Sequence, residues 1–194
     1  MDERLLFNLE IILVDFFSAY GLITLLYLIL LPFIKNPLLK KLDNQSNLFI
    51  SFIGIVYLIT VSTTTLVLLN ILDEESKTHL LQRMFGKYWF GFWIQPLLWV
   101  SITQFLRFEV IRKNILLRLL FSLLLILSIE KMVILFTSFH RDYLPSSWSM
   151  SHNPFYPSNF FLELLMKVSI YLLFVGLFFF ITKKINNWRI AKAK

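Results

Sequence analysis

The 194-residue sequence has no cysteine, only five glycines and only three histidines. Without cysteine the chain cannot form a disulfide, a thiolate-ligated iron–sulfur or zinc site, or a covalent c-type haem. So few glycines provide no Gly-rich phosphate loop. His79, His140 and His152 all lie outside the long apolar segments, so the chain does not resemble a cytochrome b, whose haem is held between helices by histidines. We therefore expect no cofactor in this chain itself.

Charge is also scarce. Charged residues make up 16% of the sequence and hydrophobic residues 57%. A soluble domain typically has roughly 25% charged and 45–50% apolar residues. Because so few charges cannot cover a water-exposed surface, the composition excludes a soluble enzyme, a disordered protein and a coiled coil. It indicates an integral membrane protein.

Long apolar segments dominate the sequence, and a membrane-spanning helix needs about 20 mostly apolar residues. Five segments have this character: residues 11–34, 48–72, 88–106, 115–139 and 160–182. We therefore predict an all-α integral membrane protein, with residues 1–194 forming a single membrane domain, a bundle of five transmembrane helices. Pro32 and Pro37 are expected to end the first helix, and Pro96 is expected to kink the third.

The loops between these segments differ in basic charge. Those expected on one side of the membrane carry, together with the C-terminal tail, twelve Lys and Arg residues, whereas the other side carries five. Because cytoplasmic loops are enriched in Lys and Arg, this bias predicts an outside N-terminus and a cytoplasmic C-terminus. The net charge of +7 follows from the bias and from attraction to anionic lipid, so it needs no nucleic acid partner.

Apart from Arg118, which is counted with the basic loop before the fourth segment, five charged residues fall within the predicted spans: Asp15, Glu130, Lys131, Glu163 and Lys167. At a rise of about 1.5 Å per residue, all of them lie in the outer half of the predicted bundle, and we expect essentially none in the inner half. Glu163 and Lys167 stand at i and i+4, in the favourable order for an ion pair. Asp15 and Lys131 have related depths and are candidates to pair between helices.

Glu130 is the deepest carboxylate, and it shares a polar helical face with Ser138 and the nearby Thr137. One interpretation is a proton half-path of Glu130, Lys131, Thr137 and Ser138, because a desolvated carboxyl group can exchange its proton. The other is structural, with Glu130 satisfied by Lys131 or by polar groups of the bundle. The hydroxyls of residues 62–65 are expected to bond to carbonyls of their own helix or to a neighbouring helix.

Several motifs follow one another along the third and fourth segments. The sequence reads FGKYW at 85–89, EKMVI at 130–134 and TSFHRDYLPSSW at 137–148. This pattern resembles the NrfD-like, or polysulfide reductase, membrane-subunit family. It is most similar to the second half of the ActC-type subunit of alternative complex III, a quinol:cytochrome c oxidoreductase. The resemblance covers roughly residues 20–182, with Lys131 in place of the family's arginine, which keeps the charge and loses the planar fork.

The resemblance implies a place in a respiratory complex. Family members bind quinol beside an iron–sulfur subunit on the outer face, and alternative complex III adds a multihaem cytochrome c subunit and a second NrfD-like membrane subunit. Quinol, iron–sulfur clusters and c-type haem are then expected in the complex and not in this chain. His140, Arg141, Asp142 and Trp148 become candidates for docking the iron–sulfur subunit. The alternative interpretation of His140, Arg141 and Asp142 is a local cap and ion pair at the membrane exit.

Three functions remain open at this point. The first is a non-catalytic or partial membrane subunit of a quinol-oxidising respiratory complex, in a bacterial cytoplasmic membrane or an organellar inner membrane. The second is a transporter or channel subunit, which charged groups within spans also suit, although the sequence has no internal repeat of the kind that many transporters show. The third is a purely structural or assembly subunit of a membrane complex.

Overall fold

The computed structural model describes residues 3–33, 36–87, 89–128, 156–157 and 159–192. The part of the chain that it describes is helical and contains no strand, which confirms the predicted all-α class. The helices are α1 (Glu3–Leu30), α2 (Pro37–Ile71), α3 (Glu74–Phe85), α4 (Trp89–Phe105), α5 (Glu109–Lys113), α6 (Ile115–Ile126) and α8 (Phe160–Lys192).

Three stretches of helix are long and apolar enough to cross a membrane: Leu5–Leu30, Pro37–Ile71 and Phe161–Trp188. Helix α4 has 17 residues and α6 has 12, both below the length of about 20 that a span needs. The predicted fourth span, residues 115–139, begins with α6, but its part beyond residue 128 lies outside the described residues. The described helices thus support a membrane protein with three candidate spans, and five crossings remain a prediction.

The connection between α1 and α2 is determined by Pro and Asn. Pro32 follows the end of α1, as predicted, and Pro37 takes the first position of α2, where its missing N–H loses no helical hydrogen bond. The Asn36 side chain caps α2 by accepting a hydrogen bond from the Leu38 N–H at 2.9 Å. With 35 residues, α2 is about 52 Å long, so it extends well beyond the predicted span that begins at residue 48.

Helix α3 lies in a segment that the sequence indicated only as a loop between two spans. Asp73 caps its N-terminus, accepting a hydrogen bond from the Ser76 N–H at 3.3 Å. Hydrogen bonds from the Ser76 side chain and backbone lower the pKa of the Asp73 carboxyl group. Two glutamates occupy the first turn and Arg83 the last, an order that suits the helix dipole.

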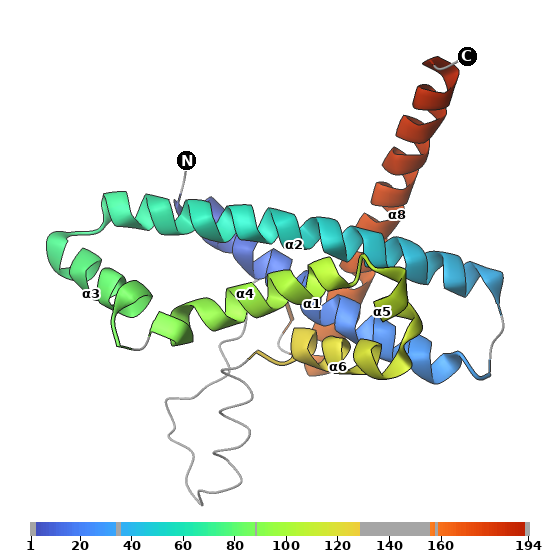
Figure 1. Ribbon diagram of the computed structural model, residues 1–194, viewed down its shortest axis with the longest axis horizontal. Coiled ribbons are helices and arrows are strands. Elements are labelled where there is room, and N and C mark those ends of the chain that lie inside the picture. The colour runs from blue at the N-terminus through green and yellow to red at the C-terminus, as the bar shows by residue number, and fades with distance from the viewer. Residues whose placement is uncertain (1–2, 34–35, 88, 129–155, 158, 193–194) are drawn as a thin grey trace, which may run out of the picture.

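Helix α1 is central and contacts α2, α6 and α8, while α2 also packs against α4. Figure 1 shows α3 at the far end of α2, folded back toward α4, and α8 crossing the other helices before its C-terminal half projects away from them. Of the most apolar stretch of α8, 11% is buried, against 44% for α1. Most of the apolar side chains of α8 are therefore exposed in the described part of the chain.

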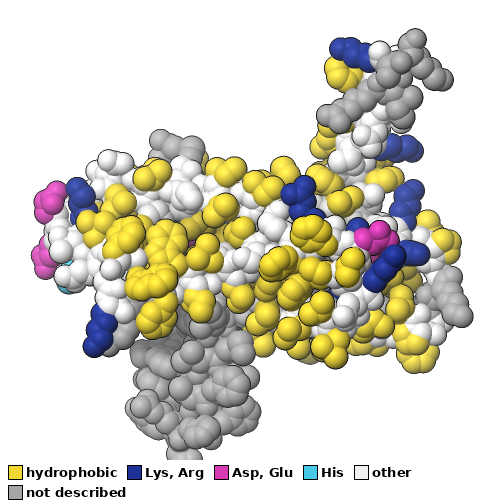
Figure 2. All heavy atoms as spheres, in the orientation of Figure 1, with side chains coloured by type: hydrophobic (Ala, Val, Ile, Leu, Met, Phe, Trp, Pro, Cys, Tyr) yellow, Lys and Arg dark blue, Asp and Glu magenta, His cyan; other side chains and the backbone are white. Residues whose placement is uncertain are grey.

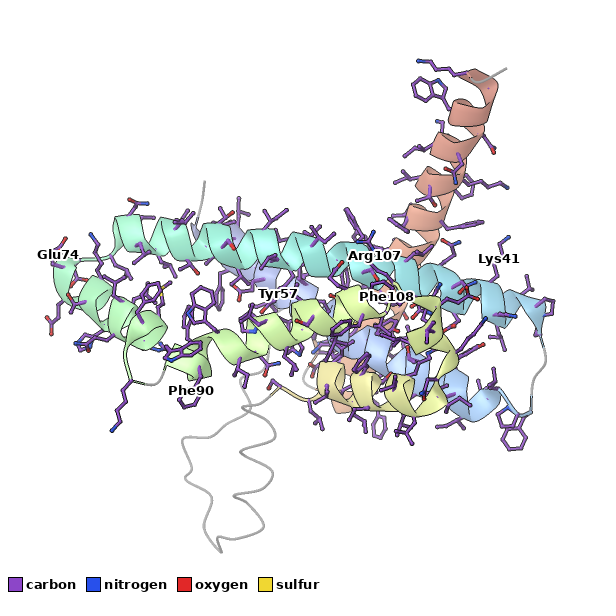
Figure 3. The ribbon with its side chains drawn as sticks, viewed as in Figure 1. Lys41, Tyr57, Glu74, Phe90, Arg107 and Phe108 are labelled. Atoms are coloured by element: carbon purple, nitrogen blue, oxygen red, sulfur yellow. The ribbon has the colours of Figure 1, made fainter. Side chains whose placement is uncertain are left out.

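An aromatic cluster forms the core where α1, α2, α4 and α8 meet. Phe17 is fully buried, and the centroid of its ring lies 5.1 Å from that of Tyr57 and 5.4 Å from that of Trp99. Tyr171 of α8 packs edge-on against Phe49 of α2 at 5.5 Å. Tilted and edge-to-face pairs at these distances are the arrangements that aromatic rings favour. Figure 3 shows Tyr57 between α2 and α4.

The polar side chains of α2 and α4 behave largely as predicted. Ser62, Thr63 and Thr65 each donate a hydrogen bond of 2.8 Å to a carbonyl one turn earlier in α2. Gln104 of α4 donates instead across the helix contact, to the Ser51 carbonyl at 3.0 Å. These groups are satisfied structurally, so they provide no evidence for a binding site, whereas the buried Thr64 hydroxyl, contrary to the expectation, has no hydrogen-bond partner among the described residues. Helix α4 continues through Pro96, and the kink there remains a prediction.

Gly21 lets α1 and α6 approach closely, as small residues commonly do between membrane helices. A Cβ at this position would lie 2.7 Å from the Ser122 carbonyl oxygen and 2.6 Å from Ile126. Because a backbone oxygen cannot rotate away, Gly21→Ala should force the helices apart and lower the free energy of unfolding by about 1–3 kcal/mol. Chemical unfolding in detergent micelles, followed by circular dichroism, measures this change.

Gly91→Ala provides the matched control for this variant. Nothing lies within 4 Å of a Cβ at Gly91, and alanine is favoured over glycine in a helix by about 1 kcal/mol. The same substitution is thus expected to stabilise at one site and destabilise at the other. A Gly21→Ala protein as stable as the Gly91→Ala protein would contradict the close α1–α6 contact.

Candidate functional site

The residues predicted for the proton half-path and the docking surface fall between positions 130 and 148. All of them lie outside the residues that the structure describes: Glu130, Lys131, Thr137, Ser138, His140, Arg141, Asp142 and Trp148. Their roles therefore remain predictions. Within the described helices, buried charges form two groups. We call Asp15, Glu163 and Lys167 the lysine cluster, and Asp43 with Arg118 the arginine pair.

The lysine cluster joins α1 to the N-terminal part of α8. The Lys167 ammonium lies 2.7 Å from a Glu163 carboxylate oxygen and 2.8 Å from an Asp15 carboxylate oxygen. The predicted i, i+4 pair of Glu163 and Lys167 is confirmed. Asp15 was a candidate partner for Lys131, but its ion pair in the structure is with Lys167 from the facing helix.

The charges of the lysine cluster do not balance, since two carboxylates face one ammonium. The Asp15 Oδ2 atom is buried and has no hydrogen-bond partner among the described residues. Tyr156, which precedes α8, places its ring 5.0 Å from the Lys167 ammonium. Burial and the nearby Asp15 and Glu163 carboxylates raise the pKa of the Tyr156 phenol, which therefore stays neutral. The cluster thus places two carboxyl groups against one ammonium at the contact between α1 and α8.

The arginine pair joins α6 to the N-terminal part of α2. Arg118 donates to both carboxylate oxygens of Asp43, and the Nη1–Oδ2 distance is 3.2 Å. The two side chains are 5% and 11% exposed. The guanidinium also lies over the Tyr27 ring, 5.2 Å from its centroid. A bidentate, buried pair of this kind fixes the position of α6 against α2 and α1.

Hydroxyl and amide groups continue this polar interior between the two groups of charges. The Tyr20 hydroxyl donates to Asn47 Oδ1 at 2.7 Å, and Asn47 lies one turn from Asp43. The Tyr171 and Ser46 hydroxyls are 2.8 Å apart, and Tyr171 lies one turn from Lys167. These bonds connect α1, α2 and α8 where all the participating groups are buried.

The structure extends α2 beyond the predicted span of residues 48–72, and the additional turns contain the charged residue Asp43. Asp43 lies within a candidate membrane span and forms a buried ion pair with Arg118. From the sequence, both residues were assigned to loops, because Asp43 precedes the segment that begins at residue 48 and Arg118 stands near a basic loop at the start of the segment 115–139. A signal was present for Arg118, since Arg118 and Ser122 place polar groups four residues apart on an otherwise apolar helix.

Metal binding finds no support in the described part of the chain. None of its His, Asp and Glu residues form a group of three or more that could hold a metal ion. The buried carboxylates pair instead with Lys167 and Arg118. What the structure shows for these side chains is ion pairing between helices.

Comparisons with protein-family models, curated proteins and solved structures give no match to this chain. A likeness to the NrfD-like family therefore depends on the pattern of residues in the sequence. The described helices show that three stretches are long and apolar enough to cross a membrane, and that charged side chains pair between helices in two places.

Proposed function

We propose that this chain is a membrane subunit of a quinol-oxidising respiratory complex of the alternative complex III type. It supplies a helix bundle and a proton half-path, while partner iron–sulfur and multihaem cytochrome c subunits carry the electrons. The observation that carries the proposal is the ordered residue pattern from Glu130 to Trp148. In that pattern a carboxylate within an apolar segment precedes the sequence TSFHRDYLPSSW, as in the family that it resembles.

The apolar surface of the described helices supports a place within a larger membrane assembly. Hydrophobic side chains cover much of the face seen in Figure 2. Several large ones on α8 are exposed: Leu173, Phe174, Leu177, Phe180 and Ile181. A second NrfD-like membrane subunit is the proposed partner for such a surface, with lipid covering the rest.

The proposed topology has five crossings, an outside N-terminus and a cytoplasmic C-terminus, in a bacterial cytoplasmic membrane or an organellar inner membrane. Its support is the bias of twelve Lys and Arg residues against five. In this orientation the lysine cluster lies toward the outer side, as does Glu130. The arginine pair lies toward the cytoplasmic side, near the basic loop that precedes α6.

Purification of the tagged protein in a gentle detergent tests the proposal most directly. Mass spectrometry of the purified sample should identify iron–sulfur, cytochrome c and second NrfD-like subunits, and a redox difference spectrum should show c-type haem. A colourless protein without partners would overturn the respiratory function. The charged lysine cluster would then favour a transporter subunit, which solute uptake into liposomes containing the pure protein would detect.

Glu130→Gln tests the proton half-path within the assembled complex. Loss of the exchangeable proton should lower proton-coupled turnover by about tenfold or more, in line with the contribution of a positioned acid or base. The complex should still assemble, because glutamine has nearly the same size. Glu109→Gln, at an exposed position of α5, is the control and should turn over normally. Normal turnover in Glu130→Gln would exclude the proton path and leave the subunit assignment standing.

A further inference from the structure

A groove opens between α2 and α8 at the point where α8 leaves the other helices. Its volume is about 470 Å³, within the range typical of small-molecule sites. Its lining includes Gln45, Leu48 and Phe52 of α2, Arg107 after α4, and Phe178 and Thr182 of α8. The groove thus combines apolar walls with a few polar groups near one end, and neither the buried charges nor the proposed proton half-path uses it.

The only charge among the described residues that line the groove is positive. Among the residues that line it, Arg107 is charged and none is acidic. The Arg107 guanidinium forms no ion pair with any described residue, and its hydrogen bond to Gln104 Oε1 is long at 3.4 Å. Most of its five N–H donors therefore remain available for an anion. Figure 3 shows Arg107 close to the place where α8 leaves α2.

A second cation stands near the same end of the groove. Lys41 lies one turn before Gln45 on α2, and its ammonium is 4.9 Å from the centroid of the Phe179 ring on α8. The apolar lining of the groove also includes Ile55 of α2 and Ile185 of α8. A ligand that fits has an anionic head at Arg107 and hydrocarbon along the helices.

We propose that this groove binds an anionic glycerophospholipid, with its phosphate at Arg107 and its acyl chains against α2 and α8. Phospholipid matches both halves of the lining, whereas a free phosphate would use only Arg107 and an apolar partner helix would leave Arg107 unpaired. Basic side chains near a membrane surface attract anionic lipid.

Native mass spectrometry of the purified protein, with equal amounts of phosphatidylglycerol and phosphatidylcholine added, tests this site. The wild-type protein should retain phosphatidylglycerol about fivefold more than phosphatidylcholine, the preference that one basic side chain supplies near anionic lipid. Arg107→Gln should lose the preference. Arg83→Gln, which removes an exposed arginine at the end of α3 far from the groove, should keep it.

A second set of variants tests the acyl walls without changing charge. Ile55→Trp should reduce retention of both lipids by filling the groove, and Ile185→Trp repeats this test from α8 should the first variant fail to fold. Equal preference in Arg107→Gln and Arg83→Gln would overturn the proposal. Displacement of the lipid by glycerol phosphate would also overturn it, because it would indicate a simple anion site. A dimer without retained lipid would overturn it too, because it would indicate that a second copy of the chain occupies the groove.

Discussion

Arg118→Ala is expected to lower the free energy of unfolding by about 3–5 kcal/mol, as is typical when one partner of a buried ion pair is removed. Asp43 would stay in place with a side chain only 11% exposed. Its carboxylate would then have neither a counter-charge nor the two hydrogen bonds that Arg118 donates. The packing of the guanidinium over the Tyr27 ring is lost as well.

Urea unfolding in detergent micelles, followed by circular dichroism, measures this loss, and Lys113→Ala is its control. Lys113 forms an ion pair of 2.9 Å with Glu109 on α5, but the two side chains are 75% and 69% exposed. Solvent screens such a pair, so its removal should leave the unfolding midpoint nearly unchanged. Equal effects of Arg118→Ala and Lys113→Ala would show that the arginine pair is not buried.

Removing both charges distinguishes the net contribution of the ion pair to the free energy of unfolding from the penalty of leaving a buried carboxylate unpaired. Arg118→Met combined with Asp43→Leu leaves an apolar contact of similar size between α6 and α2, and such replacements are often neutral or stabilising. The double variant should recover most of the stability that Arg118→Ala loses. A double variant that is no more stable than the single one would assign the effect to lost packing instead of an unpaired charge.

The helical class could be predicted from the sequence because the lengths of the apolar segments set it. The predicted segment 88–106 corresponds to α4 (Trp89–Phe105), and the segment starting at residue 160 corresponds to α8. Segment ends were less predictable, since a helix continues into polar sequence wherever other helices satisfy its side chains. Helix α2 begins at Pro37 and not at residue 48 for this reason, with Asn47 and Ser46 buried against Tyr20 and Tyr171.

The candidate site shows the same division between local and long-range information. The pair of Glu163 and Lys167 follows from spacing on one helix, and the structure confirms it. Asp15 joins these residues only because α1 packs against α8, which no local pattern reveals. Likewise, Arg118 was counted among loop charges because its sequence neighbourhood is basic, and its burial depends on Asp43 in another helix.

Lys167→Met is expected to lower the free energy of unfolding by about 3 kcal/mol. This value is near the lower end of the range for a broken buried ion pair, because the lysine cluster is slightly more exposed than the arginine pair. The side chains of Lys167, Asp15 and Glu163 are 20%, 11% and 24% exposed. Without the ammonium, two carboxylates face each other at the α1–α8 contact and repel. Hydrogen exchange should increase most at the N-terminal end of α8.

Two further variants show whether charge or size causes this loss. Lys167→Arg keeps the positive charge and should retain much of the stability, although its planar fork fits two separate carboxylates less well. Lys77→Met is the exposed control, because Lys77 pairs at 3.5 Å with a Glu74 side chain that is 91% exposed, and it should behave like the wild type. Comparable losses in Lys167→Arg and Lys167→Met would contradict an electrostatic role.

Neutralising the whole lysine cluster then separates a structural role from a proton-transfer role, an argument that depends on the proposed respiratory function. Lys167→Met with Asp15→Asn and Glu163→Gln leaves no excess charge between α1 and α8, so the triple variant should regain stability over Lys167→Met and assemble. If the cluster only joins the two helices, turnover of the assembled complex stays normal at every pH. If the cluster passes protons toward Glu130, turnover falls and its pH profile changes, because three titratable groups have been removed from the path while the helix contact is preserved.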